Sequence, residues 1–155
     1  MTHPPPIVAE FLQARRIAVA GVSRGNASAA NPVFRKLRAS GYEVVPVNPN
    51  ASEAEGVKCY PDLRSIPGPV DGVVVATHPA VSLAVVRDAA EAGIRRLWFH
   101  RSFGAGSVSR EAVKECETRG ISCIVGGCPL MYYEPVDFGH RCIRKILEWQ
   151  RRVPR

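Results

Sequence analysis

Short apolar runs alternate with mixed apolar and polar stretches along most of the chain. Residues 17–22 form a continuous apolar run, and residues 70–77 contain the most apolar one. Runs of this length are typical of strands that are buried on both faces of a sheet. We expect further strands at residues 42–47, 94–100 and 121–125, and a short one at residues 57–60.

Capping residues, prolines and glycines indicate helices between most of these strands. Asn31 suits the N-cap of a helix over residues 32–38, because its side chain can accept a hydrogen bond from the first turn. Pro32 suits the first helical position, and Gly41 ends the helix. Further helices are expected at residues 5–15, 80–92, 109–119 and 138–152.

The alternation of strands and helices predicts the fold class. It indicates an α/β, Rossmann-like, doubly wound parallel sheet of about five strands with flanking helices. The 155 residues are expected to form one domain, with a core over about residues 10–135 and a C-terminal helix over about residues 138–152. In such a sheet, ligands lie beyond the carboxyl ends of the strands. The loops that follow the strands are therefore the candidate site.

Composition narrows the class of protein. With 46% hydrophobic residues, the chain can bury a core without disulfides or a metal. No apolar run reaches 18 residues, and the N-terminus lacks the pattern of a signal peptide, so a cytoplasmic protein is expected. The five cysteines include no C-x-x-C pair and indicate reduced thiols.

The net charge of +7 favours an anionic partner. Part of the excess lies near the C-terminus, at Arg141, Arg144, Lys145, Arg151, Arg152 and Arg155. This stretch is interpreted as a solvated helix face. A nucleic-acid surface is disfavoured, because the sequence carries no nucleic-acid module and only 7% aromatic residues.

The loop after the first strand has the character of a phosphate-binding turn. Gly21 permits a tight turn, and Gly25 lets backbone amides approach a phosphate closely. Ser23 can donate a hydrogen bond, Arg24 can supply charge, and Asn26 completes the loop. Because Ser23 replaces the second glycine of G-x-G-x-x-G, an ordinary strand-to-helix turn remains the alternative.

The turn after the second strand argues against NAD. An NAD site has Asp or Glu there to accept hydrogen bonds from the ribose, whereas this chain has Asn48, Pro49 and Asn50. This rigid, neutral turn can lie against a phosphorylated adenosine without repelling it.

Several short motifs in a fixed order resemble the small stand-alone CoA-binding proteins of bacteria and archaea, whose domain also opens the alpha subunit of succinyl-CoA synthetase. The motifs are Gly21-x-Ser23, Val47-Asn48-Pro49, residues 56–61, Ile66-Pro67 followed by Val70-Asp71, and Cys128-Pro129. The resemblance covers roughly residues 10–135. It implies that the protein binds coenzyme A or an acyl-CoA.

The resemblance also implies a site on four loops at strand ends. Ser23, Arg24, Gly25 and Asn26 match the loop that holds the CoA phosphates, and Asn48, Pro49 and Asn50 match the turn beside the adenosine. His78 and Pro79 match a segment that flanks the cofactor, and Arg101, Ser102 and Gly104 belong to the next strand-end loop.

Two departures from the family limit what the resemblance implies. Many relatives have a lysine at the position of Asn50, which leaves Arg24 or Arg101 as the alternative partner of the 3′-phosphate. The synthetase also has a phosphohistidine domain and a partner subunit, for which this chain has no room. Ligase activity is therefore not expected.

Three other groups of residues have alternative interpretations. Cys128 either faces the cofactor thiol, where it could form a mixed disulfide, or packs as a buried apolar side chain. The loop at residues 100–107 could bind a second anion, but no G-x-S-x-G elbow supports catalysis there. His140 and Cys142 match no zinc spacing, so no metal is predicted, and His140 is expected to pack or hydrogen-bond at the start of the last helix.

The leading hypothesis is a CoA-binding module that senses, stores or presents CoA or an acyl-CoA, without catalysis of its own. An NADP-dependent oxidoreductase on the same fold is the first alternative. The second is a ligand-free interaction domain, in which Met131, Tyr132, Tyr133 and Trp149 form a dimer contact.

Overall fold

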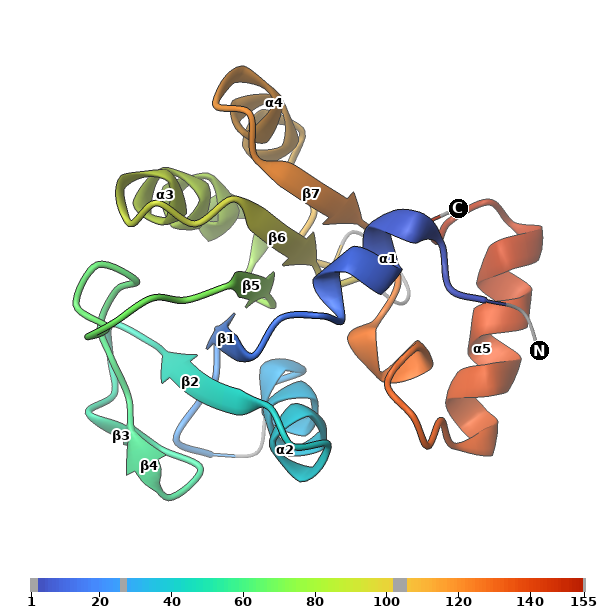
Figure 1. Cartoon of the computed structure of the whole chain (residues 1–155), viewed down its shortest axis with the longest axis horizontal. Helices are drawn as coiled ribbons and strands as arrows, with labels where there is room; N and C mark the ends of the chain where they lie inside the picture. The colour runs from blue at the N-terminus through green and yellow to red at the C-terminus, as the bar shows by residue number, and fades with distance from the viewer. Residues whose placement is uncertain (1–2, 26–27, 102–105, 155) are drawn as a thin grey trace.

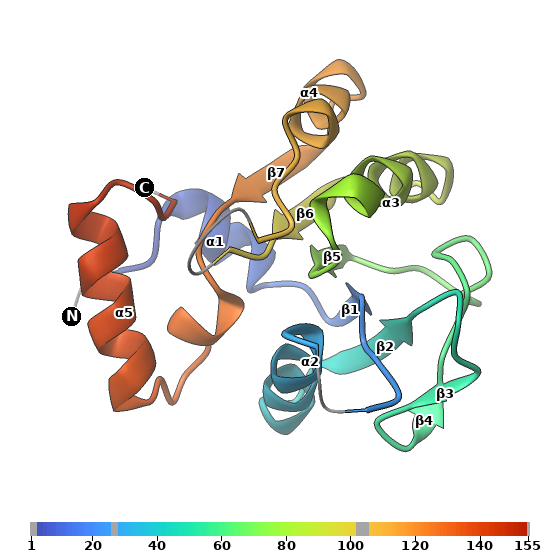
Figure 2. The same ribbon diagram turned by 180° about the vertical axis from the view of Figure 1, so that it is seen from behind.

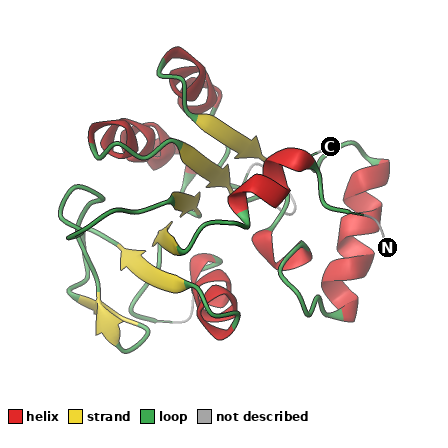
Figure 3. Ribbon diagram, viewed as in Figure 1, coloured by secondary structure: helices red, strands yellow, loops and turns green. Residues whose placement is uncertain are grey.

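The computed structural model describes residues 3–25, 28–101 and 106–154. In chain order the elements are α1 (Pro6–Phe11), β1 (Arg16–Ala20), α2 (Ala30–Ala39), β2 (Glu43–Val47), β3 (Glu53–Ala54), β4 (Val57–Lys58), β5 (Gly72–Val75), α3 (Pro79–Glu91), β6 (Arg96–Phe99), α4 (Arg110–Thr118), β7 (Ser122–Val125), the 3₁₀ helix η1 (Pro129–Met131) and α5 (Phe138–Trp149). Figure 3 shows helices on both sides of a central sheet.

Five strands form a parallel sheet in the order β2-β1-β5-β6-β7. The predicted fold class is confirmed. The chain first moves from β1 to β2 at one edge and then returns to the other side of β1 with β5. The strand order therefore reverses between β1 and β5, which is where ligands bind in open sheets of this kind.

Helices cover both faces of the sheet (Figures 1 and 2). A layer of buried hydrophobic side chains lies between the helices and the sheet on each face. Ile17 and Val19 point into the layer under α1, α2 and α5, whereas Ala18 and Ala20 point into the layer under α3 and α4. This alternation follows from the two-residue period of a strand. It explains why the apolar runs in the sequence are continuous, since both faces of each strand are covered.

The structure corrects the expected strand at residues 57–60. Val57 and Lys58 form β4, which pairs antiparallel with β3 in a separate two-stranded hairpin. Tyr60, at the end of the expected strand, forms a single parallel bridge with Val47 of the main sheet. The turn between β3 and β4 consists of Glu55 and Gly56, both with positive φ, at 53° and 76°. Two such residues are typical of the tight type I′ hairpin turn.

The structure also corrects the role of Asn31. This residue lies inside α2, whose N-cap position is occupied by Ala29, and Asn31 is only 1% exposed. Ser28 instead accepts the hydrogen bond from the Ala30 amide, at 3.1 Å. In α4, by contrast, the Ser109 hydroxyl caps the helix by accepting from the Ala112 amide.

Candidate functional site

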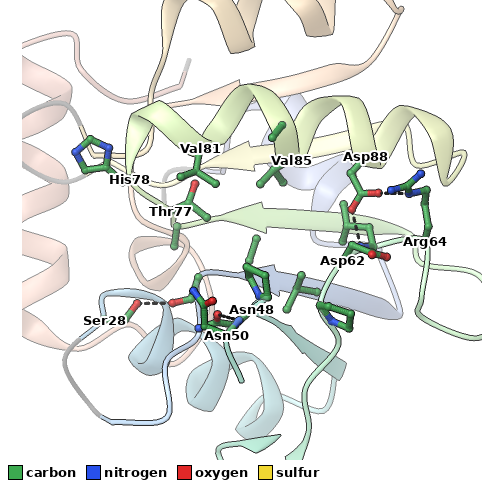
Figure 4. Close-up of a pocket in the computed structure, with 18 residues that line it drawn as sticks. Ser28, Asn48, Asn50, Asp62, Arg64, Thr77, His78, Val81, Val85 and Asp88 are labelled. Carbon is green, nitrogen blue, oxygen red and sulfur yellow. Dashed lines mark hydrogen bonds and ion pairs between the residues drawn. The ribbon is translucent and has the colours of Figure 1, made fainter. Parts of the chain in front are cut away.

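A cleft of about 560 Å³ opens at the carboxyl ends of β1, β2 and β5 (Figure 4). It lies at the point where the strand order reverses. Its walls come from the ends of these strands, the segment at residues 61–64 and one face of α3. Of the predicted site residues, Gly21, Asn48, Pro49, Asn50 and His78 line this cleft.

Gly21 forms the floor of the cleft because the ends of β1 and β5 converge there. Its amide donates to the Val47 carbonyl oxygen at 3.0 Å, and the Ala76 amide donates to the Ala20 carbonyl oxygen at 3.0 Å. Gly21 has a φ of +102°, and a Cβ on it would lie 2.5 Å from the Ala76 carbonyl oxygen. Only glycine fits this position, where the ends of β1 and β5 approach each other closely.

The turn after β2 forms a rigid wall. The Asn48 side-chain amide donates to the Val22 carbonyl oxygen at 2.9 Å, and its oxygen accepts from the Asn50 amide at 2.8 Å. Asn48 thereby ties the turn to the end of β1. Amides stand where an NAD site would have a ribose-binding carboxylate, as the sequence predicted.

One face of α3 forms the opposite wall. His78 caps this helix, because its Nδ1 accepts from the Ala80 amide at 3.2 Å. Val81, Val85 and Asp88 then follow at helical spacing along the cleft (Figure 4). Val81 is 48% exposed, so this wall presents apolar surface to an incoming ligand.

The end of the cleft away from His78 is charged but internally paired. Arg64 contacts Asp88 at 2.8 Å and Glu91 at 2.8 Å. The Asp62 carboxylate accepts hydrogen bonds from the Ser65 hydroxyl and amide, which hold the pKa of Asp62 below its usual value. Among the described lining residues, Arg64 is the only lysine or arginine.

The β1 loop (residues 21–25) connects the cleft floor with the start of α2. The Ser23 amide donates to the Asn31 side-chain oxygen at 3.0 Å, and the Ser23 hydroxyl donates to the Gly25 carbonyl oxygen. The hydroxyl that the sequence assigned to a phosphate is therefore engaged within the loop. Arg24 and Gly25 are exposed, and Asn26 lies outside the described residues.

Other predicted site residues lie away from the cleft. Pro79 is the first residue of α3, and the Arg101 amide donates to the Gly127 carbonyl oxygen beyond β6. Cys128 is 3% exposed and belongs to the core layer under α5, in line with its interpretation as a buried side chain. Ser102 and Gly104 lie outside the described residues.

Most of the residues that the second alternative hypothesis placed in a dimer contact are not on the surface. Met131, Tyr132 and Tyr133 are buried within the chain's own core, whereas Trp149 is 84% exposed.

His140 makes the predicted hydrogen bond at the start of α5, with its Nδ1 at 2.5 Å from an Asp137 carboxylate oxygen. No described helix is long and apolar enough to cross a bilayer.

Sequence reasoning missed the α3 wall and the segment at residues 61–64. The spacing of Val81, Val85 and Asp88 was visible in the sequence, but an apolar helix face is usually buried in a core. Ser28 and Thr77, which also line the cleft, carried no motif.

Comparisons with known proteins identify relatives. Over residues 15–134 the sequence matches the family model described as a CoA binding domain. It is 32% identical over 122 residues to the uncharacterized protein YneT of Bacillus subtilis, which covers 78% of this chain and 87% of YneT. It is 29% identical over 92 residues to ADP-forming acetate–CoA ligase II of Archaeoglobus fulgidus, covering 58% of this chain but only 14% of the ligase.

Two solved structures from Pyrococcus have the same fold. A hypothetical protein from Pyrococcus horikoshii superimposes with a TM-score of 0.76 at 28% identity, covering 88% of this chain and 98% of that one. A conserved hypothetical protein from Pyrococcus furiosus gives a TM-score of 0.67 at 39% identity, covering 74% of this chain and 95% of that one.

Proposed function

This chain belongs to the CoA-binding domain family, and we propose that it binds coenzyme A or an acyl-CoA in the cleft above Gly21. The observation that carries the proposal is the position of the cleft, at the reversal of strand order, over a floor that only glycine can form. We propose a binding role without catalysis, because polar side chains that line the cleft, among them Ser28, Thr77 and His78, make hydrogen bonds within the chain.

In the proposed complex, each wall contacts a different part of the cofactor. The diphosphate lies over Gly21 and near the start of α2, where the helix dipole favours negative charge. The neutral turn at Asn48 lies against the adenosine. The adenine ring packs on Val81 and Val85, which supply apolar surface without charge.

The proposal concerns ligand binding alone. It does not include the ligase activity of the larger relatives. The chain spans 14% of the Archaeoglobus ligase, so that enzyme has most of its length elsewhere. An NADP-dependent oxidoreductase is the competing function, and it would use the same cleft. The two functions differ in the ligand that binds.

Calorimetric titration at fixed salt with CoA, acetyl-CoA, NADPH and NADH tests the proposal. We expect CoA or acetyl-CoA to bind and the nicotinamide nucleotides to bind at least tenfold more weakly, a difference of about 1.4 kcal/mol. Tight binding of NADPH with none of CoA would reject the proposal.

Two substitutions at neighbouring positions test whether CoA binds in the cleft. Val81→Asp adds a carboxylate to the cleft wall, whereas Ala80→Asp adds one to an exposed position that does not line the cleft. Both changes fall in the first turn of α3, so their effects on the helix are matched. We expect Val81→Asp to weaken CoA binding and Ala80→Asp to leave it near wild type. Equal affinities would place the site elsewhere.

A further inference from the structure

The buried Asn31 side chain clamps one residue of the β1 loop. Its oxygen accepts from the Ser23 amide at 3.0 Å, and its NH₂ group donates to the Ser23 carbonyl oxygen at 2.9 Å. A side-chain amide that bonds both backbone groups of one residue fixes the orientation of the peptides on either side. Since Asn31 is 1% exposed, water cannot replace these bonds easily.

The remaining hydrogen of the Asn31 amide reaches the β3–β4 hairpin. It is donated to the Glu55 carboxylate at 2.7 Å. That carboxylate also accepts from Arg35 at 3.0 Å, and the Glu55 carbonyl oxygen accepts from Arg38 at 3.0 Å. Asn31, Arg35 and Arg38 occupy one face of α2, at spacings of four and three residues. The hairpin turn is therefore docked on α2 next to the β1 loop (Figure 2).

The backbone conformation of Glu55 is a second, independent indication that its side-chain contacts matter. Glu55 has a φ of +53° in the turn before Gly56, a position where Gly, Asn or Asp is preferred. Glutamate adopts this left-handed conformation at a cost in free energy. Its side chain is nevertheless only 11% exposed and is directed to Asn31 and Arg35. The turn geometry disfavours glutamate at this position. The hydrogen bonds of its carboxylate with Asn31 and Arg35 explain why glutamate is found there.

From this geometry we infer that Asn31 and Glu55 are positioning residues for the cofactor phosphates. Glu55 fixes the Asn31 amide, and Asn31 fixes Ser23 and the backbone N–H groups of the β1 loop. The hairpin follows the Asn48 turn in the chain, so this connection also joins the two loops on either side of the cleft floor. The inference rests on the proposed function, since the diphosphate is placed there over Gly21, where the β1 loop begins, and near the start of α2.

A Glu55→Gly variant separates this role from a purely structural one. Glycine suits the positive φ, so the hairpin turn loses its backbone strain while the Asn31 amide loses its acceptor. We expect CoA affinity to fall about tenfold and exchange of the Ser23 amide hydrogen, followed by NMR, to become faster. Removing a carboxylate near a phosphate site would by general electrostatics strengthen binding, so a loss cannot be attributed to net charge.

Two further variants serve as controls. Glu55→Gln keeps an oxygen that accepts from Asn31 but loses the charge, and it should bind CoA within about twofold of wild type. Glu53→Ala removes an exposed carboxylate from the same hairpin and should match wild type in both affinity and Ser23 exchange. Because Glu55→Gln and Glu55→Gly have the same net charge, a difference between them cannot be an effect of charge.

The outcomes distinguish the inference from the proposed function. If wild type binds CoA and Glu55→Gly binds equally well, the inference is wrong and the proposed function stands. If Glu55→Gln is as weak as Glu55→Gly, the ion pair rather than the Asn31 contact is responsible, which also overturns it. If wild type does not bind CoA, the proposed function fails. If, in addition, the Ser23 amide hydrogen exchanged at the same rate in Glu55→Gly as in wild type, Glu55 would not hold the Asn31 side chain against Ser23.

Discussion

A Gly21→Ala variant would place a methyl group between the ends of β1 and β5. The added Cβ would lie 2.5 Å from the Ala76 carbonyl oxygen and 2.9 Å from its carbon, where ordinary contacts exceed 3.4 Å. The residue would also keep a φ of +102°, which costs an L-amino acid about 1–2 kcal/mol. Forcing an extra methyl group into a packed region adds about 1–3 kcal/mol.

We therefore expect Gly21→Ala to lower the free energy of unfolding by about 3 kcal/mol. For a chain of 155 residues this corresponds to a fall in Tm of about 6–12 °C. The variant should also bind CoA more weakly, because relief of the contact moves the cleft floor. Thermal unfolding followed by circular dichroism measures the first effect, and calorimetric titration measures the second.

Gly25→Ala is the matched control. Gly25 belongs to the same loop, has no positive φ, and a Cβ on it would meet no atom within 4 Å. We expect a change of less than about 0.5 kcal/mol in unfolding free energy. If Gly21→Ala were as stable as Gly25→Ala, the close approach of the strand ends would not constrain the fold, and the reasoning about the cleft floor would be refuted.

Further predictions concern stability. Burial, and secondly the charge of His140, lower the pKa of His100, so protonation opposes folding. Stability should fall as the pH decreases through about 6.5 and level off below the lowered pKa, and His100→Gln should flatten this dependence in urea unfolding. Trp98 is fully buried and donates to the Gly126 carbonyl oxygen at 3.1 Å, so Trp98→Ala should cost about 3–5 kcal/mol. Trp149→Ala, at an 84% exposed position, should cost less than about 0.5 kcal/mol in the same assay.

The sheet could be predicted from sequence because its strands are covered on both faces. Short continuous apolar runs such as residues 17–22 and 72–76, in a chain that also shows helical caps between its strands, favour buried parallel strands over any other element. The family resemblance drawn from the motifs is confirmed. The ends of the elements were less predictable, since β1 ends at Ala20, where Gly21 turns the chain.

The candidate site was predictable only where local chemistry pointed to it. Glycine and asparagine after strands indicated Gly21 and the Asn48 turn. Asn31 was misassigned because asparagine before a proline has the local signature of a cap, whereas its partners Ser23 and Glu55 lie 8 and 24 residues away. Contacts at that distance depend on the tertiary arrangement. The valines of α3 likewise give no sign of whether they face a core or a cleft.

The order of the strands has a consequence for the chain during synthesis. The floor of the cleft needs β1 and β5, and its upper wall needs α3, so residues 16–88 must all be present before the pocket exists. A fragment that ends after β2 contains the β1 loop and its contact with β2, but it lacks β5 and α3. A ligand that binds only the assembled cleft stabilises the folded state by mass action. A ligand of the cleft would therefore stabilise the complete domain and not the shorter fragment.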